Sequence, residues 1–158
     1  MIKIKTRTKK ETENRWAYSR REIEDLFEGM GGGCRSFSRE QGEVLFRALS
    51  ALPKEIAEWA IGKLVFVSSL SEYSAYTLNI EELAGRGKVG FVVLCENLKR
   101  MSTEDQTQTI AHEIAHCWLK HPTTYDDEKI LIERGKIDEE QADDLARIWL
   151  TGKPSDAG

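Results

Sequence analysis

His112-Glu113-Ile114-Ala115-His116 is the stretch around which the chain is organised, and it lies inside the longest amphipathic helix that the sequence predicts. Residues four apart on a helix share a face, so the imidazoles of His112 and His116 can reach one ion while Glu113 projects beside them. The pattern H-E-x-x-H is typical of zinc sites. The chain has three histidines, and two of them fall in this motif. We therefore interpret the stretch as a metal site and not as two histidines that meet by chance.

Length, charge and cysteine content indicate one soluble domain. A chain of 158 residues can bury a core without disulfides. Its three cysteines are scattered and form no C-x-x-C pair, which is typical of reduced thiols in the cytoplasm. No apolar run approaches the roughly eighteen residues of a membrane span, so we expect a cytoplasmic protein with no membrane association. The net charge of −4 makes the molecule a poor general binder of polyanions.

We divide the chain into three parts. Residues 1–36 form a basic N-terminal arm, a short helix and a glycine-rich linker, residues 37–152 form the folded domain, and residues 153–158 form a disordered tail. We interpret the arm as a solubilising terminus, with a nucleic-acid contact as the weaker alternative. No Gly-Lys-Ser/Thr sequence follows the glycines, so we interpret them as a linker and not as a phosphate loop.

Helices precede the first strand in the predicted order of elements. Capping signals open helices at Ser19 with Glu22, at Ser38 with Gln41 and at Pro53, and we expect the folded core to begin at the second of these. Runs of β-branched and aromatic residues then predict strands at residues 64–67, 76–80 and 89–95.

The helix that carries the motif has a clear start and stop. Ser102, with Asp105 three residues on, caps a helix that we expect over residues 103–120, and Pro122 stops it. The apolar side chains of this helix supply enough hydrophobic surface for the helix to be buried in the core. A well-buried helix is a rigid platform for ligands.

The segment after the motif helix is acidic and leads to a last helix. We interpret residues 122–135 as a solvated loop and not as a second cation site. Asp138 with Gln141 predicts a capping box that opens the last helix, and Gly152 ends it.

Two histidines are too few for a catalytic zinc ion, which usually takes three protein ligands and leaves the fourth position to water. The candidates for the third ligand are Cys117, His121 and one carboxylate from residues 138–144. Cys117 points about 100° away from His116 on the helix, and His121 would point about 140° away if the helix continued. Only a chain reversal after Trp118 could bring His121 back, and no glycine is there to make it.

Helical periodicity separates two E-x-x-x-D pairs on the last helix, Glu139 with Asp143 and Glu140 with Asp144. At about 100° per residue, the first pair lies about 60° and 100° from the centre of the apolar face, and the second pair lies about 160° from it. We therefore assign Glu139 as the third metal ligand and Asp143 as the acceptor that fixes the tautomer of a ligand histidine. The alternative is that both are solvated acids near a helix start.

The two motifs together resemble a known family. H-E-x-x-H followed by E-x-x-A-D-x-x-A is similar to the small gluzincin metallopeptidases, and in particular to the ImmA/IrrE type that is common on bacterial mobile elements; the residues are His112 to His116, then Glu139, Ala142, Asp143 and Ala146. The likeness covers roughly residues 40 to 150. One departure is that many members of that type have asparagine where Asp143 stands here.

The resemblance implies an α+β, zincin-like fold in which a small, mostly antiparallel sheet packs on a helix bundle with the H-E-x-x-H helix at its centre. It also implies that the strand ahead of that helix, residues 89–95, lies near the cleft and pairs with an extended substrate.

With these metal ligands, the sequence predicts a zinc-dependent regulatory endopeptidase that acts on a protein or peptide. Zn²⁺ held by His112, His116 and Glu139 would activate a water, and Glu113 would be the general base that passes its proton to the leaving amine. The sequence singles out no oxyanion donor, and Tyr125 is the nearest tyrosine after the motif. The alternative is a zincin-fold binding or regulatory module whose metal site is structural or vestigial.

Overall fold

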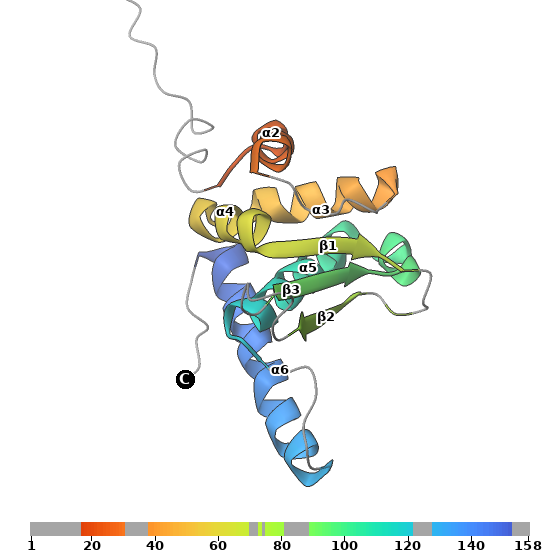
Figure 1. Cartoon of the computed structure of the whole chain (residues 1–158), viewed down its shortest axis with the longest axis vertical. Helices are drawn as coiled ribbons and strands as arrows, with labels where there is room; N and C mark the ends of the chain where they lie inside the picture. Colours follow the sequence, from red (N-terminus) through yellow and green to blue (C-terminus); the bar gives the residue numbers. More distant parts are fainter. Residues whose placement is uncertain are drawn as a thin grey trace, which may run out of the picture.

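The computed structural model describes most of the chain between residues 17 and 152, namely residues 17–30, 38–69, 73, 75–80, 89–121 and 128–152. In these residues the chain forms five α-helices, one 3-10 helix and three strands (Figure 1), so the expected α+β class is confirmed. In chain order the elements are α2 (Arg20–Met30), α3 (Arg39–Ala51), α4 (Lys54–Lys63), β1 (Leu64–Ser68), β2 (Ala75–Ile80), β3 (Val89–Leu94), η1 (Glu96–Arg100), α5 (Thr103–Trp118) and α6 (Glu128–Thr151).

The three strands form one mixed sheet in the order β1-β3-β2. β3 pairs with β1 in parallel and with β2 in antiparallel orientation. The expectation of a mostly antiparallel sheet is therefore wrong. The chain reverses from β1 to β2 and again from β2 to β3, so β3 runs in the direction of β1. Because β3 lies between the other two strands, its pairing with β1 is parallel.

β3 is the central strand, and this corrects the expectation that residues 89–95 pair with an extended substrate. Both edges of β3 are already paired within the sheet. Among the strands that the structure describes, β1 and β2 are the edge strands, and β2 lies against α5. Any strand added next to the motif helix would therefore have to pair with β2.

One row of aligned side chains crosses the sheet on the face that packs on α5. Phe66 of β1 lies opposite Val92 of β3, and Val92 lies opposite Thr77 of β2. Phe66 and Val92 are 2% and 0% exposed and pack in the core with Ile110 and Ile114 of α5. Aligned residues on neighbouring strands point to the same face of a sheet, so Thr77 is the polar end of an otherwise apolar row.

α2 packs on α3 and α4 and brings apolar side chains into the core (Figure 1). Its expected capping box is confirmed, because the amide of Glu22 donates to Ser19 Oγ at 3.2 Å and the amide of Ser19 donates to the carboxylate of Glu22 at 3.3 Å. Ile23 and Phe27 of this helix are buried members of the core. The core therefore begins before Ser38, where we expected it to start.

The capping box at the start of α3 is also confirmed, and it reaches into the sheet. Ser38 and Gln41 satisfy each other's backbone amides as a capping box requires. The side-chain amide of Gln41, which is buried, also donates to the carbonyl of Leu94 at 3.2 Å. This bond ties the start of α3 to the end of β3.

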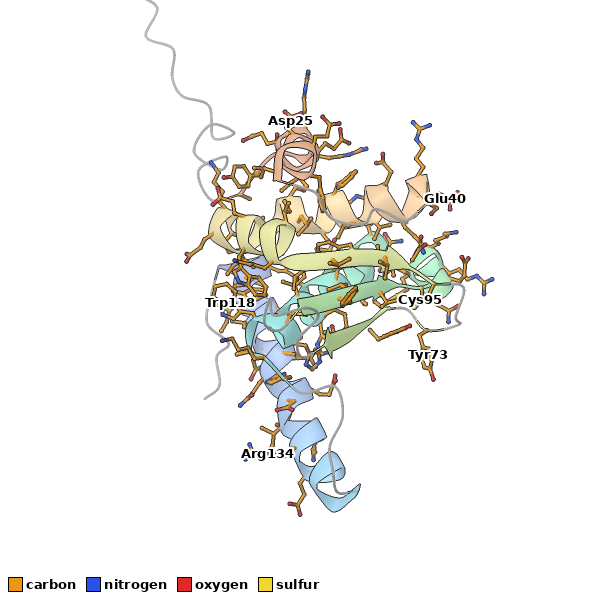
Figure 2. The ribbon with its side chains drawn as sticks, in the orientation of Figure 1. Asp25, Glu40, Tyr73, Cys95, Trp118 and Arg134 are labelled. Carbon is orange, nitrogen blue, oxygen red and sulfur yellow. The ribbon has the colours of Figure 1, made fainter. Side chains whose placement is uncertain are left out.

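Three tryptophans connect α4, α5 and α6. Trp118 at the end of α5 lies where these helices meet (Figure 2). Its ring centroid is 4.9 Å from that of Trp59 in α4 and 6.1 Å from that of Trp149 in α6, and both pairs are edge-to-face. Edge-to-face packing is a favoured arrangement of aromatic rings, so the cluster fixes one end of the α5–α6 contact.

α5 starts as expected, and the chain then reverses behind it. The amide of Asp105 donates to Ser102 Oγ at 3.2 Å. After the helix, Lys120 has a φ of 57°, a left-handed conformation that residues with a Cβ rarely adopt. The amide of His121 donates to the carbonyl of His116 at 3.0 Å and closes the reversal.

α6 begins at Glu128 and not at Asp138, so the expected loop up to residue 135 and the expected capping box with Gln141 are wrong. The stretch after Glu128 is rich in good helix formers, and a single glycine inside a helix costs only about 1 kcal/mol. Residues three apart adjoin on one helix face, which is why the Asp138–Gln141 pair resembles a cap in the sequence. The first half of α6, which includes the exposed Arg134, projects beyond the rest of the fold (Figures 1 and 2).

Several expectations fall outside the described residues. They concern the basic arm over residues 1–10, most of the glycine-rich linker, the acidic loop with Tyr125, and the tail after residue 152. The division into three parts accordingly stays a prediction. None of the helices in the described part of the chain has the length and apolar character needed to cross a membrane.

Gly135→Ala tests whether α6 is continuous. Gly135 lies inside the helix, and a Cβ added there would meet nothing within 4 Å. Alanine is more favourable than glycine in a helix interior, so we expect the substitution to raise the free energy of unfolding by about 0.5 to 1 kcal/mol, measured by urea denaturation.

Gly152→Ala is the matched control, because Gly152 also has open space around it but has a φ of +67°. Alanine is strained in that conformation and should lower the free energy of unfolding by about 1 kcal/mol. A similar loss of stability at Gly135 would show that this residue is not helical.

Candidate metal centre

α5 and α6 pack closely through small side chains. Ala115 lies on the helix surface between His112 and Trp118, which both contact α6. On the other helix, Ala142 and Ala146 are 0% exposed. Interaxial distances depend on the side chains at the contact, and alanines allow a close approach. The short acidic side chains of α6 can therefore reach the imidazoles of α5.

Three side chains from these two helices bring their donor atoms together. The Nε2 atoms of His112 and His116 lie 3.0 Å apart. Glu139 Oε2 lies 2.9 Å from Nε2 of His112, and Glu139 Oε1 lies 3.0 Å from Nε2 of His116. These three residues could hold a metal ion, and they are the three that the sequence predicted as ligands.

The donor set is of a kind that zinc takes. One ligand atom from each of the three residues lies within 4.8 Å of the others, and two imidazole nitrogens with a carboxylate oxygen are zinc ligands. The side chains of His112 and His116 are 14% and 12% exposed, whereas that of Glu139 is 62% exposed. The group is therefore anchored in the protein on the histidine side and open to solvent on the glutamate side.

Asp143 holds the other ring nitrogen of His112. Nδ1 of His112 lies 2.7 Å from Oδ1 of Asp143. A carboxylate oxygen accepts, so Nδ1 carries the proton and donates it. His112 would then present the lone pair of Nε2 to a bound ion. The fold places Asp143 in the contact that helical periodicity predicted for it.

Glu113 follows His112 on α5 and is held by β2. The hydroxyl of Thr77 lies 2.6 Å from Oε2 of Glu113 and 3.1 Å from its backbone carbonyl. Burial raises the pKa of Glu113; the hydrogen bond from Thr77 and the nearby His112 lower it, and Glu139 raises it. A carboxylate with a raised pKa is a stronger base than an exposed one.

The surroundings of His116 favour the neutral form that binds metal ions. Burial lowers the pKa of His116, the neighbouring His112 acts in the same direction, and Glu139 opposes them. Only the neutral imidazole has a free lone pair for a metal ion. The surroundings of His116 therefore favour ligation.

His121 corrects the expectation that its side chain points away from the motif. The left-handed backbone at Lys120 makes the reversal without a glycine, and Nδ1 of His121 lies 2.8 Å from Nδ1 of His116. Its side chain is 9% exposed. His121 contacts the ring nitrogen of His116 that faces away from the three donors, so it is not the third ligand.

The other candidates lie where they cannot ligate this ion. Cys117 packs in the core, and burial raises the pKa of its thiol to about 12. A thiol at neutral pH is not the thiolate that metals bind. Glu140 is exposed and lies outside the three-residue group.

Sequence reasoning missed Thr77 and the contact of Asp138 and Gln141 with His121. Thr77 could be found only once β2 was known to lie against α5. Asp138 had a signal, because the periodicity that selected Glu139 places Asp138 about 40° from the centre of the apolar face of α6. Its exposure of 8% agrees with that position.

Comparison of the chain with protein-family models, with curated proteins and with solved structures finds no match. The geometry of the site and the two sequence motifs are therefore the features that indicate its function.

Glu139→Gln tests the three-donor group. A neutral amide is a weaker ligand than a carboxylate, so elemental analysis after equilibration with zinc should find about one ion per wild-type chain and far less in the variant.

Glu140→Gln is the matched control, since it makes the same charge change one residue along on the exposed face of α6. Its metal content should equal that of the wild type. Equal metal in both variants would exclude Glu139 as a ligand.

Glu113→Gln tests the cost of burying this carboxylate. The pKa of Glu113 is raised in the folded state, so its favourable contribution to stability is present below the unfolded pKa and is lost as pH rises through the folded pKa. Glutamine stays neutral and can still accept from Thr77. We expect metal-free Glu113→Gln to have a higher Tm than wild type at about pH 7.5, and no advantage near about pH 4, by circular dichroism. A gain in Tm that grows toward low pH would contradict this.

Proposed function

We propose that the protein is a zinc-dependent metallopeptidase with a zincin-like fold of the gluzincin type, which hydrolyses peptide bonds in a protein or peptide substrate. The observation that carries the proposal is the placement of Glu113. Glu113 follows the candidate ligand His112 on α5, interacts electrostatically with His112 and Glu139, receives a hydrogen bond from Thr77, and has a pKa raised by burial. This is the arrangement that a general base requires.

The number and exposure of the ligands support a catalytic rather than a structural ion. Structural zinc sites are closed by four protein ligands, whereas catalytic sites use three and keep a position open. In the described part of the chain the group has three members, and the side chain of Glu139 is 62% exposed. A structural site would also have no use for a carboxylate beside the ligands.

The chain's own residues divide the work of hydrolysis. A zinc ion held by His112, His116 and Glu139 would supply Lewis-acid polarisation of the scissile carbonyl. Glu113 takes the proton of the attacking water and passes it to the leaving amine. Thr77 donates to Oε2 of Glu113, and among the hydrogen bonds of the described residues Oε1 is the oxygen that remains to accept that proton.

The position of β2 at the edge of the sheet favours a peptide as the substrate. Among the described strands, none pairs with the edge of β2 that faces away from β3. Thr77 connects this strand to Glu113, so a peptide added along the edge would pass the general base. Tyr73, which is 72% exposed, projects into solvent near this strand with its ring 6.3 Å from that of Tyr76 (Figure 2). The edge thus offers both backbone pairing and an aromatic contact.

Cleavage of a library of internally quenched peptides tests the proposal. We expect zinc-loaded wild type to cleave members of the library and Glu113→Gln to cleave them at least about 100-fold more slowly, because the general base is lost. Glu113→Gln should retain its fold and its zinc, and Glu140→Gln should retain its activity.

Zinc binding by the wild type without any cleavage above the level of Glu113→Gln would refute the peptidase. A protein partner whose capture survives both zinc removal and Glu113→Gln would then favour the binding module.

A further inference from the structure

We propose that His121 is a positioning residue that fixes the tautomer of the metal ligand His116, and that Asp138 and Gln141 fix the tautomer of His121 in turn. The inference rests on the proposed metal site. It concerns a chain of hydrogen bonds that begins at the ring nitrogen of His116 facing away from the ion and ends on α6.

Both ring nitrogens of His121 have polar partners. Its Nδ1 lies 2.8 Å from Nδ1 of His116. Its Nε2 lies 3.0 Å from Oε1 of Gln141 and 3.5 Å from Oδ1 of Asp138. His121 and Asp138 are each 8% exposed, so the chain of bonds is shielded from solvent. Buried polar groups need partners, and these groups provide them for one another.

One proton lies between the two facing Nδ1 atoms, and there are two ways to place it on neutral rings. If His121 carried it, Nε2 of His121 would be a lone pair directed at a carboxylate oxygen of Asp138, which also only accepts. The Nε2 of His116 would then bear a proton and could not bind a metal ion. This placement leaves acceptors facing acceptors.

The other placement gives both ring nitrogens of His121 a partner and leaves the lone pairs of His112, His116 and Glu139 to converge on a bound cation. His116 donates from Nδ1 to Nδ1 of His121, and His121 donates from Nε2 to Oε1 of Gln141, with Oδ1 of Asp138 3.5 Å from the same nitrogen. His116 then presents the lone pair of Nε2 toward Glu139 and His112. The geometry therefore selects the tautomer of His116 that a metal ion needs.

The backbone supports this role for His121 independently. The residue before it, Lys120, has a φ of 57°, and the amide of His121 donates to the carbonyl of His116. A lysine in this conformation is strained, and the surrounding structure must hold it there. The reversal at Lys120 brings the ring of His121 into contact with the ring of His116.

Zinc affinity measured against a competing chelator tests the proposal on the full chain. We expect His121→Phe to weaken zinc binding by about 10- to 100-fold, because its ring fills the space but cannot accept from His116. His121→Asn should stay within a few-fold of wild type, since its Oδ1 is an acceptor at the position of Nδ1. The exposed Glu140→Gln should bind as wild type does.

A role in packing alone would reverse this order, because phenylalanine preserves the volume of the side chain and asparagine does not. Zinc affinity of His121→Phe equal to wild type, or weaker binding by His121→Asn than by His121→Phe, would overturn the proposal.

Ring ¹⁵N NMR of the wild type adds a readout that needs no substitution. Long-range ¹H–¹⁵N spectra of the zinc-loaded protein should show a proton on Nδ1 of His116 and on Nε2 of His121, and none on Nδ1 of His121. The opposite assignment would overturn the proposal even if the variants failed to fold.

These measurements are separate from the test of function. Correct tautomers and zinc affinities together with no peptide cleavage would uphold the role of His121 and refute the peptidase. Wild-type zinc affinity in His121→Phe together with peptide cleavage by the wild type would refute the role of His121 and uphold the peptidase.

Discussion

The close contact between α5 and α6 is the constraint on which the site depends. No donor set exists on either helix alone, because α5 supplies the two imidazoles and α6 supplies the carboxylate. Carboxylate side chains are short, so they reach the imidazoles only if the helices approach closely, and the buried Ala142 and Ala146 permit this. The edge-to-face pair of Trp118 and Trp149 closes the same contact near the end of α5. A larger side chain in place of either alanine would separate ligands that lie far apart in the sequence.

The sheet and α6 hold different parts of the motif. Thr77 of β2 binds Glu113, whereas residues of α6 bind His112 directly and His116 both directly and through His121. The motif helix therefore lies between a surface that orients the base and a surface that orients the ligands. Because these contacts come from different elements, the base and the ligands can be altered separately. The apolar row that ends at Thr77 places the strand, and the packing of the helices places the ligands.

Local periodicity was enough to predict some of these features and not others. Glu139 and Asp143 were placed correctly on α6 because the angle between residues on a helix is fixed by the backbone. The start of α6 was predicted wrongly. Asp138 and Gln141 are three residues apart, and this spacing occurs both in a capping box and between neighbours on one face of a continuous helix. His121 was misplaced because a glycine was taken as necessary for the reversal, while the tertiary contacts hold Lys120 in that conformation. The mixed sheet depends on which strand is inserted between the others, and a linear sequence carries no direct signal for that.

The reversal after α5 also defines a pattern for recognising other chains that build this arrangement. A left-handed residue four positions after the second motif histidine is required, whatever side chain it carries. Glycine adopts that conformation without steric conflict and asparagine tolerates it, so both would build the loop with less strain than Lys120 does. The pattern H-E-x-x-H followed by three residues, a glycine or asparagine, and a histidine therefore describes the same three-histidine geometry. Lysine at this position makes the present chain a strained example of a loop whose least strained form contains glycine.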